Sequence, residues 1–308
     1  MELKNKKIVI TGGTGFLGEH VVTKLKQLGA VDIMIPLSKK YDLRNRSVCE
    51  EVVKNKDIVI HLAAQIGGIG FINDHQGEVF YNNLVMGVEL MEAARKARVG
   101  KFVSVGTVCE YPKFSPMPFK EEDLWDGYPE ETTAPYGWAK KMLLVQAKAY
   151  KKQYGFNAVH LLPVNLYGPG DNFDSESGHV IAALIQKIIT ARDSNAKSVE
   201  VWGTGTATRE FLYVEDAAEG VVLAAAHYDD IKPVNLGSGT ETSIKDIAGI
   251  IMKLANYSGS ITWNIAKPDG QPRRQLNVSK AKRFGFEAKT DLHSGLKKTI
   301  EWYENHKI

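Results

Sequence analysis

Hydrophobic residues in the first half of this chain form two alternating patterns. Short apolar runs at 7–11, 31–35, 57–64 and 101–105 are typical of strands buried in a parallel sheet. Between these runs, apolar residues recur every three or four positions, first from the end of the first run to residue 28 and again over 83–98. This spacing predicts amphipathic helices. Strands that alternate with helices predict an α/β fold with a doubly wound parallel sheet.

The second half continues this alternation without a flexible linker or an internal repeat. The same patterns predict strands at 158–162, 209–213 and 234–237, and helices at 134–154, 179–192, 214–227, 243–256 and 291–304. We therefore expect the elements of the second half to pack closely on those of the first.

A glycine-rich turn joins the first predicted strand to the first helix. Gly12, Gly15 and Gly18 stand three residues apart, a pattern that permits a tight turn and close approach of the backbone to a diphosphate. The helix would then point its N-terminus at the phosphates. This predicts a Rossmann-type dinucleotide-binding domain over 1–170, to which 203–237 returns. A smaller C-terminal α/β substrate lobe is predicted over 171–202 and 238–308.

The residues after the second strand bear on which dinucleotide is bound. A carboxylate at this strand end would bind a ribose 2′-hydroxyl and repel a 2′-phosphate. The chain has Ser38, Lys39 and Lys40 there instead, and hydroxyl and ammonium groups suit a 2′-phosphate. This favours NADP as the cofactor, with NAD as the alternative. If the two lysines bind no cofactor, they are a solvated pair on a surface loop.

Tyr136 and Lys140 stand four residues apart, just after Pro135, near the start of a long predicted helix. At that spacing both side chains lie on one helix face. An ammonium about 4 Å from a phenol, at an effective dielectric near 20, contributes roughly 4 kcal/mol. We therefore expect Lys140 to lower the pKa of Tyr136, so that the phenol exchanges a proton while a hydride moves.

Composition excludes several other classes of protein. The chain has 308 residues, of which 44% are hydrophobic and 24% charged, with a net charge of +3 and no basic block, so we expect no nucleic-acid partner. Cys49 and Cys109 make neither a disulfide framework nor a metal site. The charged start and the lack of a long apolar run predict no signal peptide and no membrane span, hence a cytoplasmic protein.

These motifs together resemble the extended short-chain dehydrogenase/reductases. The glycine loop, Leu62–Ala64, Asn83, Thr107, Tyr136 and Lys140 occur in that family's order. Within the family, the chain is similar to the GDP-L-fucose synthase branch, which epimerises and reduces a GDP-4-keto-6-deoxy hexose. That similarity is carried by residues 65–69, 109–112, 163–169, 171–173, 178–180, 201–205, 209–213 and 267–270.

The resemblance implies roles for individual residues. Thr107, Tyr136 and Lys140 would support hydride transfer, while Cys109 and His179 would be the acid–base pair of epimerisation. The substrate's diphosphate end would meet Lys187, Trp202 and Arg209. The implied cofactor contacts are Gly12, Thr14, Gly15, Phe16, Leu17, Ser38, Lys39, Asp42, Leu43, Leu62, Ala63, Ala64, Asn83, Tyr136, Lys140, Pro163, Asn165, Leu166 and His179. The family also implies a homodimer that pairs the helices at 83–98 and 134–154.

The chemistry is consistent with these roles, since a 4-keto sugar has acidic C–H bonds at C3 and C5. Cys109 and His179 have reference pKa values near 8.5 and 6.5, so both can exchange protons near neutrality. Thr107 and Cys109 would alternate along an extended segment and face one cleft.

The expected enzyme is an NADP-dependent epimerase/reductase of a GDP-4-keto-6-deoxy hexose. The alternatives are a reductase or epimerase alone on a related GDP-, UDP- or CDP-sugar such as a heptose, and a non-catalytic dinucleotide sensor. A 4,6-dehydratase is disfavoured because Val108 and Cys109 replace that branch's Asp-Glu.

Overall fold

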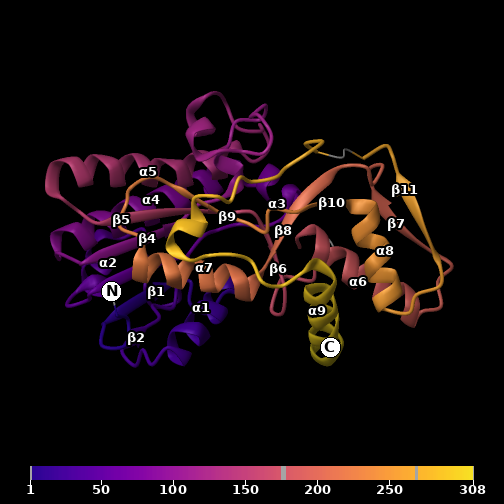
Figure 1. Ribbon diagram of the computed structural model, residues 1–308, viewed down its shortest axis with the longest axis horizontal. Helices are drawn as coiled ribbons and strands as arrows, with labels where there is room; N and C mark the ends of the chain where they lie inside the picture. The colour runs from indigo at the N-terminus through magenta and orange to yellow at the C-terminus, as the bar shows by residue number, and fades with distance from the viewer. Residues whose placement is uncertain (1, 175–177, 268–269, 308) are drawn as a thin grey trace.

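The computed structural model describes residues 2–174, 178–267 and 270–307, and a six-stranded parallel sheet forms its larger part (Figure 1). The strand order is β2-β1-β3-β4-β5-β9. The strands are β1 (Ile8–Thr11), β2 (Ile33–Met34), β3 (Ile58–His61), β4 (Lys101–Val105), β5 (Ala158–Pro163) and β9 (Val234–Leu236). β1, β3, β4 and β5 are buried along their whole length because helices cover both faces of the sheet.

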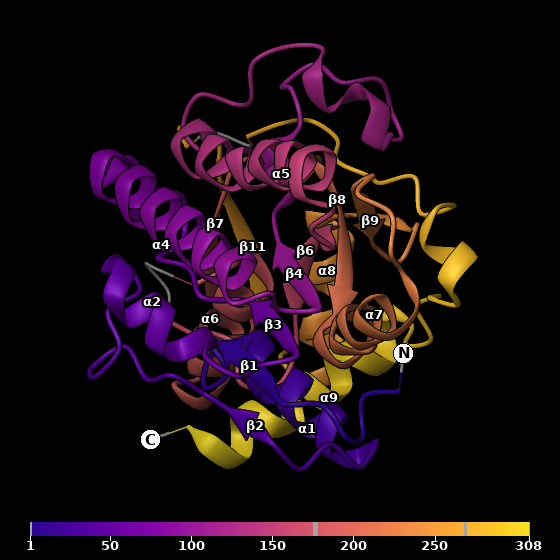
Figure 2. The ribbon, with the colours of Figure 1, turned by 90° about the vertical axis from the view of Figure 1, so that its left-hand side faces the viewer.

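Helices pack on the two faces of this sheet, as Figure 2 shows. One face carries α1 (Phe16–Gln27) and α7 (Val214–His227), which pack on each other. The other carries α2 (Arg46–Val53), α4 (Gln76–Lys96) and α5 (Ala134–Tyr154), with α4 between its two neighbours. A short α3 (Ile69–Asp74) precedes α4. The predicted doubly wound α/β sheet is therefore confirmed.

The smaller part of the molecule has its own sheets and hydrophobic core (Figure 1). One sheet orders its strands β10 (Glu241–Ser243), β8 (Thr208–Tyr213) and β6 (Asn165–Tyr167), and the other pairs β11 (Ser260–Asn264) with β7 (Ser198–Trp202). The core there is formed largely by α6 (Val180–Asp193), α8 (Ile244–Leu254) and α9 (Leu292–His306).

The structure differs from the sequence expectations in two places near the site. Helix α4 begins at Gln76, not at Asn83. Residues 108–110 form a 3-10 turn, η1 (Val108–Glu110), so Thr107 and Cys109 do not alternate along an extended segment. Two further 3-10 turns, η2 (Glu121–Trp125) and η3 (Ala281–Phe284), lie in connecting segments.

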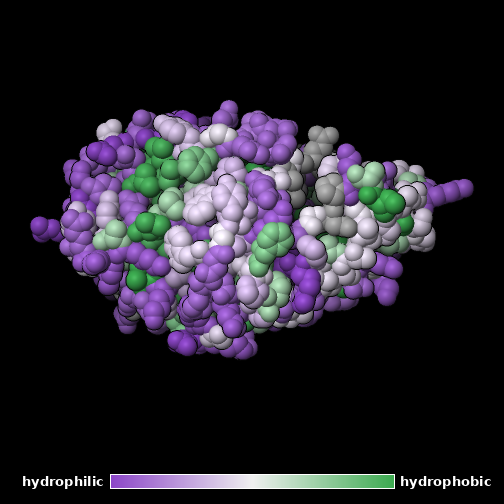
Figure 3. Space-filling view, turned by 90° about the horizontal axis from the view of Figure 1, so that it is seen from above, coloured by the Kyte–Doolittle hydropathy of each residue, from purple (hydrophilic) through white to green (hydrophobic). Residues whose placement is uncertain are grey.

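The surface seen in Figure 3 is mostly hydrophilic, with small hydrophobic patches separated from one another. Among the described residues, no helix is both long enough and apolar enough to cross a membrane. In the same residues, no group of three or more histidine, cysteine or acidic side chains is placed to hold a metal ion.

Candidate active site

The glycine turn after β1 lies directly against the loop after β3. Gly12 has φ of +71°, and a Cβ there would stand 2.8 Å from the Ala63 nitrogen. A Cβ on Gly18 would stand 2.0 Å from the Gly12 carbonyl oxygen, so α1 begins hard against the turn. Only glycine permits this close packing, which is what a dinucleotide cradle requires. Thr14, Gly15, Phe16 and Leu17 follow at the start of α1 with partly or fully exposed positions.

The residues after β2 have different surroundings from one another. Ser38 and Lys39 are exposed, as a site for a 2′-phosphate requires. The ammonium of Lys40 lies 5.0 Å from the Tyr41 ring centroid. The Asp42 carboxylate is bound by the Arg44 guanidinium, which lowers the pKa of Asp42.

Leu43, another predicted cofactor contact, has a buried side chain. The Cys49 thiol donates to its carbonyl oxygen. The Asp42 carboxylate is therefore already bound by Arg44, and the Leu43 side chain lies in the core. The Asp42 side chain is 39% exposed and can still accept a hydrogen bond, whereas a cofactor contact from Leu43 would come from its backbone.

The loop Leu62–Ala64 is held in place from both sides. The Ala63 N–H donates to Thr11 Oγ1 over 3.3 Å. Asn83 is buried and brackets the next residue, since its Oδ1 accepts from the Gln65 N–H at 3.0 Å and its Nδ2 donates to the Gln65 oxygen at 2.8 Å. Asn83 thus fixes the loop backbone, a role that sequence reasoning did not separate from direct cofactor contact.

Tyr136 and Lys140 lie on one face of α5, as their spacing predicts, and both are buried. The Lys140 Nζ lies 5.9 Å from the Tyr136 ring centroid and donates to the Ala63 oxygen over 3.4 Å. This brings the Tyr-x-x-x-Lys pair to the loop that follows β3. Because the sheet is parallel, that loop and the glycine turn both lie at the carboxyl ends of the strands, where α/β proteins bind ligands.

The expectation that Lys140 lowers the pKa of Tyr136 is wrong. Burial raises the pKa of Tyr136, and the nearby Cys109 and Glu110 raise it further. Burial also lowers the pKa of Lys140, to about 8. In both groups burial disfavours the charged form and is the largest cause of the shift. A phenol in this state keeps its proton at neutral pH and is a proton donor.

Thr107 and Cys109 stand beside Tyr136 because η1 packs on α5. Thr107 Oγ1 caps η1 by accepting from the Cys109 N–H at 3.2 Å. A Cβ on Gly137 would lie 2.2 Å from the Cys109 oxygen, so the glycine next to Tyr136 sets the approach of the two elements. Thr107, Cys109, Tyr136 and Lys140 therefore form one cluster, which we call the Tyr136 cluster.

His179 is the N-cap of α6, and its side chain is 47% exposed. Its Nδ1 lies 3.4 Å from Asp171 Oδ1, and this contact raises the pKa of His179. Asp171 is buried, and its Oδ2 has no hydrogen-bond partner within the described part of the chain. Sequence reasoning included Asp171 in the resemblance but gave it no role.

The predicted nicotinamide-side and substrate residues lie on β5, β6, α6, β7 and β8. Pro163 ends β5, and the Asn165 amide at the start of β6, next to Leu166, donates to the Glu210 oxygen. Lys187 Nζ lies 6.0 Å from the centroid of the exposed Trp202 ring, and Lys267 Nζ lies 4.9 Å from it. Arg209 Nη1 donates to the Thr208 oxygen. Lys187 and Trp202 are thus brought together, with Arg209 on the neighbouring sheet.

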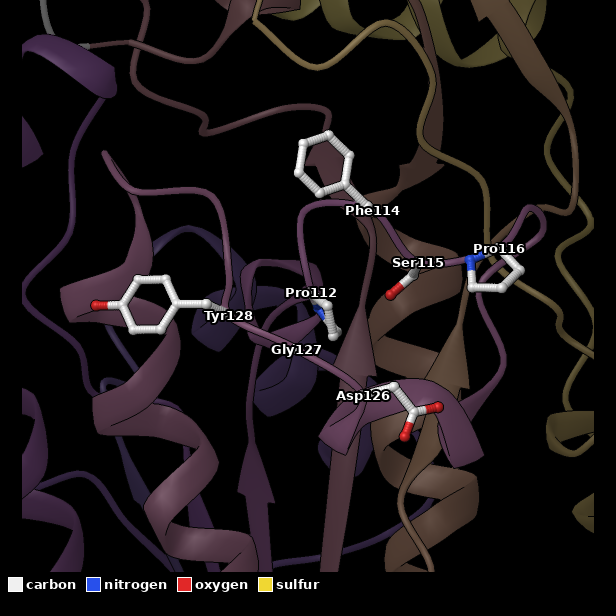
Figure 4. A pocket seen from close by; sticks show the side chains of 7 residues that line it. All are labelled: Pro112, Phe114, Ser115, Pro116, Asp126, Gly127 and Tyr128. Carbon is white, nitrogen blue, oxygen red and sulfur yellow. The ribbon is translucent and has the colours of Figure 1, made fainter.

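A small cavity of about 220 Å³ opens beyond η1, in the connection that leads to α5 (Figure 4). None of the predicted site residues lines it. The Gln271 amide donates to the Lys113 oxygen within this connection and so ties it to the second half of the chain. The lining residues are Pro112, Phe114, Ser115, Pro116, Asp126, Gly127 and Tyr128.

Comparison with known proteins agrees with this geometry. Residues 8–237 match the NAD dependent epimerase/dehydratase family. The chain belongs to that family. This identifies an NAD(P)-dependent enzyme of the extended short-chain dehydrogenase/reductase type, and the close Gly12–Ala63 and Gly18–Gly12 packing fits its dinucleotide.

Relatives within the epimerase/dehydratase family span nearly the whole chain. A probable GDP-L-fucose synthase of Oryza sativa subsp. japonica is 36% identical over 99% of this chain and 94% of that protein. The structure of a GDP-6-OMe-4-keto-L-xylo-heptose reductase from C. jejuni aligns with a TM-score of 0.93, at 27% identity, over 99% of both chains. A GDP-L-fucose synthetase from Naegleria fowleri, bound to NADP, aligns with a TM-score of 0.88 at 27% identity, over 98% of this chain and 95% of that one.

Proposed function

We propose that this protein is an NADP-dependent epimerase/reductase of a GDP-4-keto-6-deoxy hexose. The observation that carries the proposal is the Tyr136 cluster, which brings together a protonated phenol, a buried ammonium and a thiol. The cluster lies at the carboxyl ends of the strands, where the glycine turn also lies. Relatives named as GDP-L-fucose synthases over nearly the whole chain support the GDP sugar.

Each group in the cluster has a distinct task in this proposal. Bound NADPH would supply the hydride for C4 of the sugar. Tyr136 gives its proton to the C4 oxygen, since a phenol with a raised pKa is protonated and can donate. Thr107 donates a hydrogen bond to the same oxygen while C3 and C5 exchange protons. Cys109 and His179 carry that exchange, and Lys140 holds positive charge beside the phenol.

Two NADP-side groups support the choice of cofactor. Ser38 and Lys39 are exposed after β2, where a 2′-phosphate would lie. The C. jejuni GDP-mannoheptose C4 reductase and the Naegleria synthetase were both solved with NADP. NAD is the alternative, and the ratio of kcat/KM for NADPH and NADH decides between them.

The test of the proposal is NADPH consumption with a GDP-4-keto-6-deoxy hexose. Tyr136→Phe removes the proton donor, so kcat should fall at least about 10²-fold, as for loss of a general acid. Tyr150→Phe is the matched control on the same helix, because the Tyr150 hydroxyl donates to Glu92 away from the cluster. Undiminished turnover in Tyr136→Phe would reject the mechanism.

A reductase that does not epimerise is the second candidate, and the high structural similarity to the C. jejuni heptose reductase favours it. Product made in deuterated water separates the two candidates by NMR. Deuterium at C3 and C5 supports epimerisation, and its absence supports reduction alone on a related sugar.

A further inference from the structure

A chain of buried polar side chains runs beneath the Tyr136 cluster. Ser104 on β4, His160 on β5 and Glu110 on η1 are each 0% exposed. Ser104 Oγ lies 2.8 Å from His160 Nδ1, and His160 Nε2 lies 3.1 Å from both Glu110 oxygens. Glu110 Oε1 also accepts from the Thr107 N–H over 3.0 Å. The chain thus ends on the backbone of a cluster residue.

The hydrogen bonds of this chain fix where its protons lie. The Ser104 hydroxyl donates to the Val159 oxygen, so Ser104 Oγ accepts from the His160 Nδ1–H. The other imidazole nitrogen, Nε2, then faces the Glu110 carboxylate. Each polar group in the chain is satisfied, as burial of such groups requires.

Neighbouring backbone is shaped to admit this pair. A Cβ on Gly106 would lie 2.1 Å from Glu110 Oε1 and 2.6 Å from His160 Nε2. Glu110 and Thr107 also form a capping box, in which the side chain of each residue accepts a hydrogen bond from a backbone N–H at the opposite end of η1. The segment 106–110 is therefore held at Thr107 and Glu110, the residues on either side of Cys109.

We propose that Glu110 and His160 are positioning residues that hold Thr107 and Cys109 against α5. They lie beneath the cluster, fully buried, and act through the segment they bind. The inference rests on the proposed function, because it assumes that Thr107 and Cys109 act on the sugar. It adds that both stages of the reaction depend on one buried pair located behind the site.

Variants of Glu110 test the proposal directly. Glu110→Gln keeps the shape, accepts from Thr107 N–H and donates to neutral His160, so kcat should stay within about threefold of wild type. Glu110→Ala frees the segment, and a displacement near 1 Å should lower kcat about 10²-fold. Both NADPH oxidation and deuterium exchange at C3 and C5 should fall, while KM for NADPH stays within about twofold. Wild-type kcat in Glu110→Ala would overturn the proposal.

A double variant separates positioning from mere stability. Replacing both buried partners by apolar residues, in Glu110→Leu/His160→Leu, should recover much of the stability that either single change loses. Its kcat should stay low, because nothing then binds the Thr107 N–H. Recovery of kcat together with Tm would overturn the proposal. Lys101→Met is the matched control, since it removes a buried ammonium that contacts the exposed Asp229 and two backbone oxygens elsewhere, and it should lower Tm without lowering kcat.

A readout independent of the sugar separates this proposal from the proposed function. In a Cys49→Ala background, the rate of Cys109 alkylation by iodoacetamide reports how firmly the segment is held. The rate should rise at least about threefold in Glu110→Ala and stay unchanged in Glu110→Gln and Lys101→Met. If wild-type protein does not turn over the sugar but shows this pattern, the proposed function fails and the positioning role stands. Equal rates in all variants reject the positioning role.

Discussion

At the scale of single residues, burial sets the protonation of the Tyr136–Lys140 pair. The four-residue spacing predicted that both side chains share a helix face, and the structure places them so. The direction of the pKa shift at Tyr136 could not be predicted, because it depends on desolvation by elements distant in sequence. Glu110 and His160 were missed for a similar reason, since they stand 50 residues apart.

The buried ammonium of Lys140 should make stability depend on pH. Its pKa falls from an ordinary 10.5 to about 8 in the folded protein. Between those values the unfolded chain binds more protons, so stability rises with pH over that range. Lys140→Met should remove this rise and increase the unfolding free energy at pH 7 by up to about 3 kcal/mol, while abolishing turnover. Urea unfolding at pH 7 and 9.5 measures both effects, and an unchanged pH slope would contradict them.

The Asp171 carboxylate should control the proton on His179. Their contact raises the pKa of His179, so the imidazole holds its proton to higher pH than an ordinary histidine. Asp171→Asn removes the negative charge and should shift the His179 pKa downward, leaving less imidazolium at pH 7. NMR titration of the His179 ring, assigned with His179→Gln, measures the shift, and the exposed His293 serves as an internal reference. The idea fails if the His179 titration is the same in both proteins.

At the scale of elements, the site depends on the close approach of α5 to η1. Gly137→Ala would place a Cβ 2.2 Å from the Cys109 oxygen and force the two elements apart. We expect kcat to fall about 10²-fold from a displacement of this kind, with NADPH affinity nearly unchanged. Gly249→Ala on α8 is the matched control, because nothing lies within 4 Å of its added Cβ. Equal kcat in the two variants would show that the approach is not critical.

Long, periodic elements were predicted well, and short ones were not. The predicted helix at 134–154 and strand at 158–162 match α5 and β5 to within a residue. The strands β6 and β10 were missed because each has three residues and carries no pattern of its own. The five-residue strands β7 and β11 and the eight-residue helix α2 were missed as well. The prediction missed the first turns of α4, Gln76–Asn82, because their hydrophobic residues, Val79, Phe80 and Tyr81, stand in a row and do not recur at helical spacing. Tertiary contacts, which the sequence does not display, set these boundaries.

At the scale of the whole molecule, the predicted homodimer concerns the outer surface of α4 and α5. The division into a cofactor domain and a substrate lobe, and the homodimer, remain predictions. Helices α4 and α5 lie side by side on one face of the sheet (Figure 2). Their outer surface exposes Tyr81 and Val145, at 59% and 43%. Exposed apolar side chains on two adjacent helices are the surface that a four-helix interface would bury.

Val145→Glu should therefore separate the two copies. A carboxylate placed in an apolar interface is desolvated without a partner, which costs several kcal/mol and opposes association. Light scattering should show a dimer for wild type and a monomer for Val145→Glu at the same concentration. Val31→Glu is the matched control, because Val31 is 89% exposed and precedes β2, away from α4 and α5. Each chain holds its own Tyr136 cluster, so the Val145→Glu monomer should keep its kcat. A monomeric wild type would instead assign these apolar residues to the free surface.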